Sequence, residues 1–373
     1  MDFKVAIIGA GVIGLAIARK LSSKYPDVIV LEKHNKFGQE TSSRNSEVIH
    51  SGVYYPSNSL KSKLCVEGRK LLYRFCRANE INYNKCGKLI IATTTEEKEQ
   101  LKSIQLNSIK NGVSNSRIIE ANEIEEIEPN INAISAIRYP STGIIDSHGL
   151  MKRLETDCIN NNGQIAYGNK VNKIRKIENG FSIIVEDELE SEFEFTSEIV
   201  INASGLEAYN ISSAIGLAKE EYKQYFWKGE YFAIGNGKNK LINSLIYPVP
   251  DKNITGLGVH TTIDLNHGAK LGPNAIYLNG IPKDYSVDAG NRKSFYESAK
   301  KFLPFLEVGD LHPDQAGIRA KLQKPGDPFR DFIITNEAEN GLPNFINLIG
   351  IESPGLTSCL SIANYVDSLI INN

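Results

Sequence analysis

Residues 4–32 read KVAIIGAGVIGLAIARKLSSKYPDVIVLE, and this stretch decides the fold. Residues 4–8 form an apolar run that ends at a glycine, which is typical of a buried parallel strand. Residues 12–24 repeat apolar side chains at helical spacing, and residues 28–31 form a second apolar run that is closed by Glu32. The stretch therefore predicts a compact strand–helix–strand unit of about 30 residues.

The turn between the first strand and the helix reads GAGVIG at residues 9–14. Gly9 makes the tight turn, Gly11 admits a pyrophosphate close to the backbone, and Gly14 lets the helix pack closely on the strand. The N–H groups at the start of the helix carry a partial positive charge that favours phosphate. Glu32 follows Gly14 by 18 residues (32 − 14) and is placed to accept hydrogen bonds from ribose hydroxyls. The pattern predicts a dinucleotide-binding site.

Three features favour FAD over NAD as the dinucleotide. The motif lies near the amino terminus, as is usual in flavoproteins, and the sequence contains no second G-x-G-x-x-G. In the last thirty residues, a predicted strand at 345–350, a Ser353-Pro354-Gly355 turn and a predicted helix at 356–368 follow one another. The start of that helix is suited to face an anionic flavin ring. An ordinary terminal helix cap is the alternative interpretation of this last segment.

The remaining sequence predicts a second domain that is interleaved with the first. Residues 60–79 and 95–111 have helical patterns, and residues 164–185 predict a strand, a turn and a strand. Residues 221–316 are rich in tyrosine and in short β-like runs, including 229–234 and 256–260, without β-α-β alternation, which favours an antiparallel sheet. We expect an α/β fold in which a Rossmann-type FAD-binding domain (1–85, 143–220 and 317–373) is interleaved with an α+β substrate domain built on an antiparallel sheet (86–142 and 221–316).

Composition and charge exclude several classes of function. The 42 Lys and Arg against 44 Asp and Glu give a net charge of −2, which argues against a nucleic-acid partner. The five cysteines include no C-x-x-C pair, so neither a zinc site nor a disulfide framework is expected, and a cytoplasmic location is favoured. No signal peptide is recognisable, and no stretch approaches the roughly 20 apolar residues of a membrane span. Peripheral membrane contact stays open.

Motifs spread along the chain carry a resemblance to a known family. They are GAGVIG at 9–14, TSSRNSEVIHSGVYY at 41–55, KLCVEG at 63–68, CGKLI at 86–90, TGIID at 142–146, GLGVH at 256–260 and AGIR at 316–319. Together they resemble the FAD-dependent L-2-hydroxyglutarate dehydrogenases and oxidases of the D-amino-acid-oxidase-like superfamily. The N-S-x-V-I-H-S-G-x-Y-Y run is the most specific of them.

The resemblance implies oxidation of a small 2-hydroxy acid, most closely L-2-hydroxyglutarate to 2-oxoglutarate, by hydride transfer to flavin N5. The chain differs from the family pattern at Glu47, where a small residue is usual. It also differs at residues 350–358, where the family reads more like N-A-P-S-P-A-A-T-S-S.

Oxidation of a 2-hydroxy acid requires a cation for the carboxylate and a base for the hydroxyl proton. Arg319 is predicted to hold the carboxylate, because a guanidinium makes bidentate contacts and because the resemblance gives this role to the arginine of the G-x-R motif. His50 and His260 are both candidates for the base, since imidazole titrates near neutral pH. His260 and Tyr55 are also predicted to contact the substrate. The alternatives are a surface salt bridge for Arg319, structural hydrogen bonds for either histidine, and core packing for Tyr55.

The predicted FAD-binding residues lie in the glycine motif, at the end of the second strand and in the polar segment 41–46. Others lie at His50, at Val171, at the end of the apolar run that precedes Ala203 and Gly205, and in the C-terminal loop. A polar turn without a ligand is the alternative for 41–46, and the resemblance assigns Val171 to the adenine. We predict non-covalent FAD and no metal. The predicted residues are Gly9, Gly11, Val12, Ile13, Gly14, Glu32, Lys33, Thr41, Ser42, Arg44, Asn45, Ser46, His50, Val171, Ala203, Gly205, Gly350, Ser353, Pro354, Gly355, Leu356 and Thr357.

Other functions stay open at this point. The V-I-H-S-G run is similar to the L-I-H-G-G run of FAD-linked glycerol-3-phosphate dehydrogenases, and amino-acid or amine oxidases share the superfamily. A phosphate substrate needs further cations, for which Lys61, Lys63 and Arg69 are the nearest candidates. A flavoprotein without turnover is a third possibility. The expected partners are a small 2-hydroxy acid and either O2 or a membrane quinone as electron acceptor.

Overall fold

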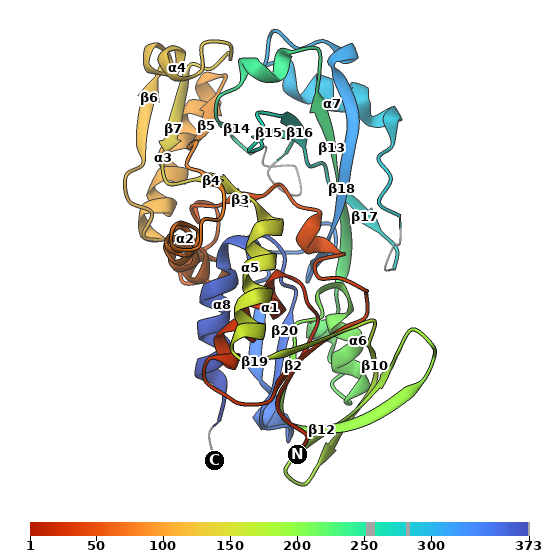
Figure 1. The fold of residues 1–373 in the computed structure, drawn as a ribbon. Coiled ribbons are helices and arrows are strands. Elements are labelled where there is room, and N and C mark those ends of the chain that lie inside the picture. The colour runs from red at the N-terminus through yellow and green to blue at the C-terminus, as the bar shows by residue number, and fades with distance from the viewer. Residues whose placement is uncertain (251–257, 281–283, 372–373) are drawn as a thin grey trace.

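The computed structural model describes residues 1–250, 258–280 and 284–371, which form two lobes (Figure 1). Both termini lie at the outer end of the lower lobe in this view. The lower lobe carries the strand–helix–strand unit predicted from residues 4–32, and the upper lobe carries most of residues 86–142 and 221–321.

An eight-stranded sheet forms the lower lobe. Its strands are β1 (Phe3–Ile8), β2 (Val28–Glu32), β9 (Gln164–Tyr167), β10 (Lys170–Ile177), β11 (Gly180–Glu186), β12 (Glu192–Asn202), β19 (Ile333–Asn336) and β20 (Phe345–Ile349). The order is β10-β11-β12-β1-β2-β9, and β20 pairs with β12 and β19. β9, β2, β1, β12 and β20 pair in parallel, whereas β10, β11 and β19 join through antiparallel pairs.

The central parallel strands β1, β2 and β20 and the second half of β12 are buried on both faces, which explains their continuous apolar runs. Because side chains alternate along a strand, Val5 and Ile7 enter one core while Ala6 and Ile8 enter another. The first core is shared with helices α1 (Val12–Ser22), α2 (Leu60–Ala78), α5 (Ser147–Asn160) and α8 (Gly355–Leu369), and the second includes α6 (Ala208–Ala214). The predicted Rossmann-type α/β architecture is confirmed.

Two sheets form the upper lobe. The first contains β13 (Tyr225–Ile234), β15 (His260–Ile263), β16 (Ala269–Gly272), β17 (Ile276–Leu278) and β18 (Leu311–Lys321), all in antiparallel pairs. The second contains β5 (Lys88–Ala92), β6 (Arg117–Glu120), β7 (Ser135–Tyr139) and β14 (Leu245–Pro248). Here β14 pairs with β5 in parallel, which the pattern of the sequence did not predict. Helices α3 (Thr95–Lys110), α4 (Ala121–Ile127) and α7 (Arg292–Ala299) cover these sheets.

A small sheet links the lobes, and it consists of β3 (Val48–Ile49), β4 (Tyr83–Asn84) and β8 (Gly143–Ile145). The predicted interleaving agrees with this course of the chain. The predicted boundary between 316 and 317 falls inside β18, whose pairing with β13 continues to Lys321. The remaining domain boundaries stay predictions.

Local differences from the predicted elements have simple causes. Residues 164–185 contain parts of three strands, because β9 extends the parallel sheet beside β2 before a turn at Gly168, with φ of +69°, starts β10. The predicted strand at 256–260 begins outside the described residues, and β15 starts at His260.

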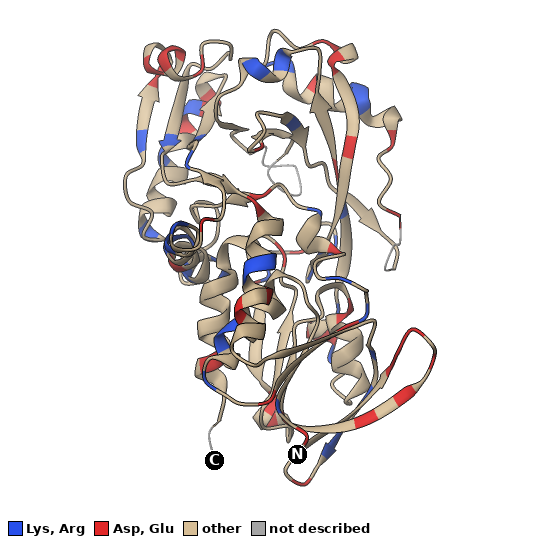
Figure 2. Ribbon diagram, viewed as in Figure 1, with Lys and Arg blue, Asp and Glu red and all other residues tan. Residues whose placement is uncertain are grey.

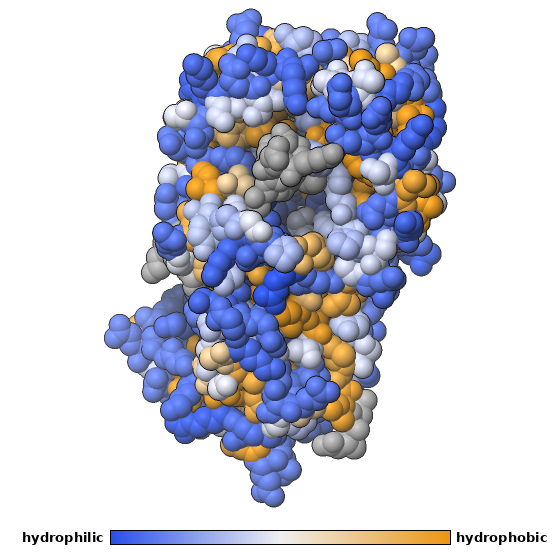
Figure 3. All heavy atoms as spheres, turned by 180° about the vertical axis from the view of Figure 1, so that it is seen from behind, coloured by the Kyte–Doolittle hydropathy of each residue, from blue (hydrophilic) through white to orange (hydrophobic). Residues whose placement is uncertain are grey.

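Charged side chains are spread over the molecule. Figure 2 shows Lys and Arg on both lobes with Asp and Glu among them, and no helix or strand presents a continuous basic face in this view. From behind, most of the surface is hydrophilic and is hollowed near the middle (Figure 3). None of the described helices combines the length and the apolar character that crossing a bilayer requires.

Candidate active site

A large cavity lies where the two lobes meet. Its volume is about 1870 Å³, and it extends from the glycine turn before α1 to strands β13 and β18 of the upper lobe. Pockets for drug-sized ligands measure about 300–1,000 Å³. The cavity therefore has room for a dinucleotide and a small substrate together.

The glycine turn forms one end of the cavity, and its three glycines differ in what surrounds them. A Cβ on Gly9 would lie 2.7 Å from the Ala203 carbonyl oxygen, and a Cβ on Gly14 would lie 1.9 Å from the Gly9 carbonyl oxygen. A Cβ on Gly11 would approach only the Ser42 side chain, with Oγ at 3.0 Å, so it would project into the cavity. The space at Gly11 is the cradle that a pyrophosphate needs.

Glu32 ties this turn to the end of β2. Its carboxylate is 7% exposed, and its oxygens accept the N–H groups of Ala10 at 2.7 Å and His34 at 3.0 Å. A carboxylate has about four acceptor positions, so two remain. The predicted contact with ribose hydroxyls is compatible with this arrangement and stays a prediction.

Most of the predicted cofactor residues line the cavity, and three do not. Gly14 is enclosed in the helix–strand contact, and a Cβ on Gly350 would lie 2.6 Å from Leu322. Thr357 is fully buried, and its hydroxyl accepts the His50 N–H at 2.9 Å and donates to the Val48 carbonyl at 3.2 Å. Thr357 therefore holds the His50 segment against α8. The lining residues among those predicted are Gly9, Gly11, Val12, Ile13, Glu32, Lys33, Thr41, Ser42, Arg44, Asn45, Ser46, His50, Val171, Ala203, Gly205, Ser353, Pro354, Gly355 and Leu356.

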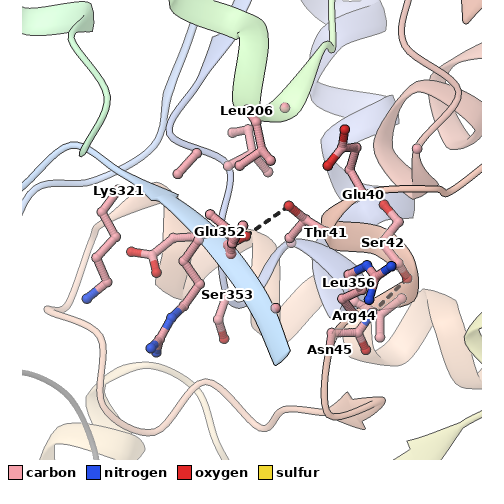
Figure 4. A pocket seen from close by; sticks show the side chains of 18 of the residues that line it. Glu40, Thr41, Ser42, Arg44, Asn45, Leu206, Lys321, Glu352, Ser353 and Leu356 are labelled. Carbon is pink, nitrogen blue, oxygen red and sulfur yellow. Dashed lines mark hydrogen bonds between the residues drawn. The ribbon is translucent and has the colours of Figure 1, made fainter. Parts of the chain in front are cut away.

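The segment 41–46 bridges the lobes along the cavity wall (Figure 4). The Thr41 hydroxyl donates to the Ile318 carbonyl of β18 at 3.0 Å, and the Ser42 hydroxyl accepts the Val12 N–H at 3.0 Å. The Arg44 guanidinium lies 4.0 Å from the centre of the Tyr285 ring. The segment is thus held by both lobes, which keeps its polar groups at the cavity.

Buried polar atoms without partners gather at this cavity. Three of the six in the described residues belong to cavity-lining side chains, namely Arg44 Nε, Tyr54 OH and Tyr247 OH. Buried polar groups in proteins nearly always have hydrogen-bond partners, so a bound ligand is the expected partner here. Together with the cradle at Gly11, these atoms make the residues a good fit for FAD and a polar substrate. No described group of His, Cys, Asp and Glu side chains is arranged to hold a metal ion.

The two candidate bases line the same cavity. The His260 ring stacks on Tyr247 with centroids 3.8 Å apart, and its Nδ1 lies 2.9 Å from the Gly258 carbonyl oxygen. A carbonyl only accepts, so Nδ1 carries the proton and Nε2 keeps a free lone pair. Burial lowers the pKa of both His50 and His260 to about 3, and the charge of Lys88 acts in the same direction. Both imidazoles are therefore neutral near pH 7, and the same burial makes each of them a weaker base than the expected imidazole that titrates near neutral pH.

Lys88, which belongs to the CGKLI motif at 86–90, is a charged neighbour of the site that was not among the predicted site residues. It is 2% exposed, and its ammonium lies over the rings of Tyr247 and Tyr54 at 4.7 and 5.2 Å. Burial lowers the pKa of Lys88 to about 8. A lysine at the start of the otherwise apolar run KLIIA was a signal in the sequence that the predicted site residues did not use.

Arg319 reaches the cavity from β18. Its Nη2 donates to the Asn274 carbonyl at 2.8 Å, which leaves most guanidinium N–H groups for a ligand. The Tyr55 hydroxyl lies 3.5 Å from Ser353 Oγ in the C-terminal loop. The structure thus brings His50 and Tyr55 from one segment, and His260 and Arg319 from two others, to one cavity.

A buried ion pair lies beside the C-terminal loop. Lys61 Nζ is 2.9 Å from Glu352 Oε1, and the two side chains are 5% and 9% exposed. Burial would raise the pKa of Glu352, but the charges of Lys61 and Lys321 outweigh it and lower the pKa. The sequence motifs did not predict an interaction between Glu352 and Lys321. The two residues come from different segments, and no local sequence pattern indicates that the fold brings their charges together.

Comparison with known proteins places the chain among flavoenzymes. The model of a family described as FAD dependent oxidoreductase matches residues 4–369. The mitochondrial L-2-hydroxyglutarate dehydrogenase of Arabidopsis thaliana is 37% identical over 96% of this chain and 82% of that protein. The L-2-hydroxyglutarate dehydrogenases of Indibacter alkaliphilus and Escherichia coli K12 are 31% and 29% identical, and cover 98% and 99% of this chain and 98% and 93% of their own lengths.

Two solved structures of oxidases have a similar fold. The L-alpha-glycerophosphate oxidase from Mycoplasma pneumoniae, solved with FAD bound, superposes with a TM-score of 0.86 at 26% identity, and covers 98% of this chain and 94% of its own. The glycine oxidase from Geobacillus kaustophilus superposes with a TM-score of 0.79 at 21% identity over 98% of this chain and 94% of its own, which supports the fold alone.

Proposed function

Because the chain belongs to the FAD-dependent oxidoreductase family, we propose that it oxidises L-2-hydroxyglutarate to 2-oxoglutarate. Three relatives with this named activity match nearly the whole chain. The observation that carries the proposal is the single cavity that is lined by two neutral histidines, by Arg319 and by the glycine cradle. Membership of an enzyme family disfavours the alternative of a flavoprotein without turnover.

Different residues of the cavity bind the substrate, orient it and exclude water. FAD, when bound, accepts the two electrons that leave the substrate. Arg319 binds the carboxylate next to the reacting carbon and fixes its orientation, since the bidentate contact allows little rotation. Tyr54 and Tyr247 line the cavity with apolar rings and exclude water, while their hydroxyls can bond a polar substrate.

A neutral histidine takes the hydroxyl proton. His260 has a defined tautomer with Nε2 free, and His50 is held by Thr357 in the segment nearest the predicted flavin site. Both are therefore kept as candidates for the base. Burial and the charge of Lys88 both disfavour the imidazolium, so the histidine is unprotonated at neutral pH and binds the substrate proton less strongly than a free imidazole would.

Substrate reduction of the bound flavin tests this function. Purified holoprotein is mixed anaerobically with excess L-2-hydroxyglutarate, and the oxidised-flavin absorption near 450 nm (roughly where flavins absorb) is followed. We expect bleaching with the L enantiomer and formation of 2-oxoglutarate, and none with the D enantiomer. Persistence of the oxidised spectrum would remove this substrate assignment.

Glycerol 3-phosphate is the second candidate substrate. The solved L-alpha-glycerophosphate oxidase is similar over the whole chain, and Lys321 and Lys61 line the cavity along with Arg319 as possible partners of a phosphate. The same anaerobic experiment with glycerol 3-phosphate separates the two candidates. Faster bleaching with the phosphate would favour this one.

The proposal extends to the electron acceptor and to the location of the protein. We keep O2 and a membrane quinone as the acceptor classes, which peroxide formation in air distinguishes. A cytoplasmic location is supported by the five free cysteines. The named relatives include mitochondrial enzymes.

A further inference from the structure

We propose that Lys321 binds the distal carboxylate of the substrate, and that it thereby makes the site selective for dicarboxylic 2-hydroxy acids. The inference rests on the proposed function and specifies its substrate class. It assigns Lys321 as a specificity-determining residue that acts together with Arg319.

The two cations are spaced for a five-carbon diacid. Arg319 and Lys321 are two residues apart on β18, so both side chains leave the same face of the strand, and both line the cavity. Two residues of a strand span about 7 Å. The carboxyl carbons of an extended five-carbon diacid are about 5 Å apart, given C–C bonds of about 1.5 Å. Flexible lysine and arginine side chains easily accommodate that difference.

The charges around Lys321 leave it available for an anion. Glu352, a carboxylate whose charge acts on Lys321, is bonded to Lys61 at 2.9 Å, so this buried pair is neutral overall. In the described part of the chain, Lys321 has no ion pair within 4.0 Å, and its ammonium lies 5.4 Å from the Trp227 ring. Lys321 is half-buried, and burial lowers its pKa even though Glu352 opposes this effect.

The sum of these charges matches a dianion. Arg319, Lys321 and Lys61 carry three positive charges, and Glu352 carries one negative charge, so these four cavity-lining side chains have a net charge of +2. Figure 4 shows Lys321 and Glu352 toward one side of the pocket, and Thr41, Ser42 and Arg44 toward the other. A monocarboxylic acid would occupy Arg319 and leave the half-buried ammonium of Lys321 without a partner, which weakens its binding.

Binding of unreactive acids tests the assignment without turnover. Glutarate and pentanoate have the same chain length but differ in one carboxylate, and each is titrated into the holoprotein while the absorption spectrum of the bound flavin is followed. We expect glutarate to bind roughly 30-fold to 100-fold more tightly than pentanoate, the effect of one charge-assisted contact. Lys321→Met should abolish this preference, and Lys321→Arg should keep most of it. Lys324→Met, three residues along and outside the cavity lining, is the matched control and should bind like the wild type.

The outcomes separate this inference from the proposed function. If Lys321→Met keeps the preference, or if the wild type shows none, the assignment of Lys321 is wrong, whether or not L-2-hydroxyglutarate reduces the flavin. If the preference depends on Lys321 but L-2-hydroxyglutarate leaves the flavin oxidised, the dicarboxylate site stands and the proposed reaction fails. If Lys321→Met does not retain FAD, Lys321→Gln is used in the same titrations with the same criterion.

Discussion

The side chains at the substrate end of the cavity show how burial prepares residues for chemistry. His260 is held by stacking on Tyr247 and by the Gly258 carbonyl, so its free nitrogen has a fixed direction. Arg319 donates one N–H to the Asn274 carbonyl, and its other N–H groups are available to a ligand. Both residues have lost the freedom of a surface side chain, which is the condition for orienting a small substrate.

Substitution of Arg319 separates substrate binding from cofactor binding. We expect Arg319→Ala to lower kcat/KM by roughly 100-fold to 1,000-fold, because a charge-assisted bidentate contact with the carboxylate is lost. Arg319→Lys should recover only part of this, since an ammonium cannot make the paired contact. Steady-state kinetics with L-2-hydroxyglutarate and the flavin content of each purified variant are measured. An equal loss of substrate and FAD binding would show that Arg319 supports the fold instead.

Individual elements depend on contacts at their ends. The carboxylate of Glu47 accepts the Ser147 N–H at 3.0 Å and the Ser147 hydroxyl at 2.6 Å, so this departure from the family pattern fastens the first turn of α5. At the start of α1, Gly11 and Gly14 act differently from Glu47: they make no side-chain contact, and their lack of a side chain leaves space for neighbouring groups. Gly14 serves the contact between helix and strand, whereas Gly11 borders the cavity.

This difference predicts that two alanine substitutions one turn apart affect different properties, namely folding stability at Gly14 and FAD affinity at Gly11. Gly14→Ala places a Cβ against the Gly9 carbonyl and should lower the free energy of unfolding by roughly 1–3 kcal/mol. Gly11→Ala meets only the Ser42 hydroxyl, so the fold should keep its stability while FAD binds at least about 10-fold more weakly. Urea unfolding of the apoprotein and flavin titration measure the two quantities. Similar losses of stability in both variants would contradict the assignment of Gly11 to the cofactor.

At the scale of the whole molecule, the cavity between the lobes collects titratable groups that folding has removed from water. His50 and His260 have folded pKa values of about 3, below their unfolded value of 6.5. Between these pH values the unfolded chain binds more protons than the folded chain. The stability of the molecule must therefore decrease as the pH falls from 6.5 toward 3.

We expect the free energy of unfolding to fall between pH 6.5 and 5 by up to about 2.7 kcal/mol per pH unit, the limit for two histidines. Urea midpoints at half-unit pH intervals measure this slope. His260→Asn should reduce the slope by about half, because one of the two neutral imidazoles is gone. His148→Asn, outside the cavity lining, should leave it unchanged. A midpoint that is constant over this range would mean that the buried histidines are already protonated in the folded state.

The sequence by itself determined the dinucleotide half of this protein. The demands on Gly9, Gly11 and Gly14 are steric and local, and a strand, a turn and a helix within about 30 residues satisfy them. Helices α2, α3 and α8 were predicted to within two residues for the same reason, because the residue patterns that favour a helix are local. Family motifs spread over the chain added the expected activity.

The tertiary structure alone decided which side chains share the cavity. His50, His260 and Arg319 come from segments that lie far apart in the chain, and only the packing of the lobes unites them. The same packing buries Thr357, whose hydroxyl accepts the His50 N–H, and it buries Lys88 against tyrosine rings. It also places Lys321 near Glu352, whose charge is neutralised by Lys61. Such contacts depend on burial and on neighbours distant in sequence, and no local pattern of residues encodes them.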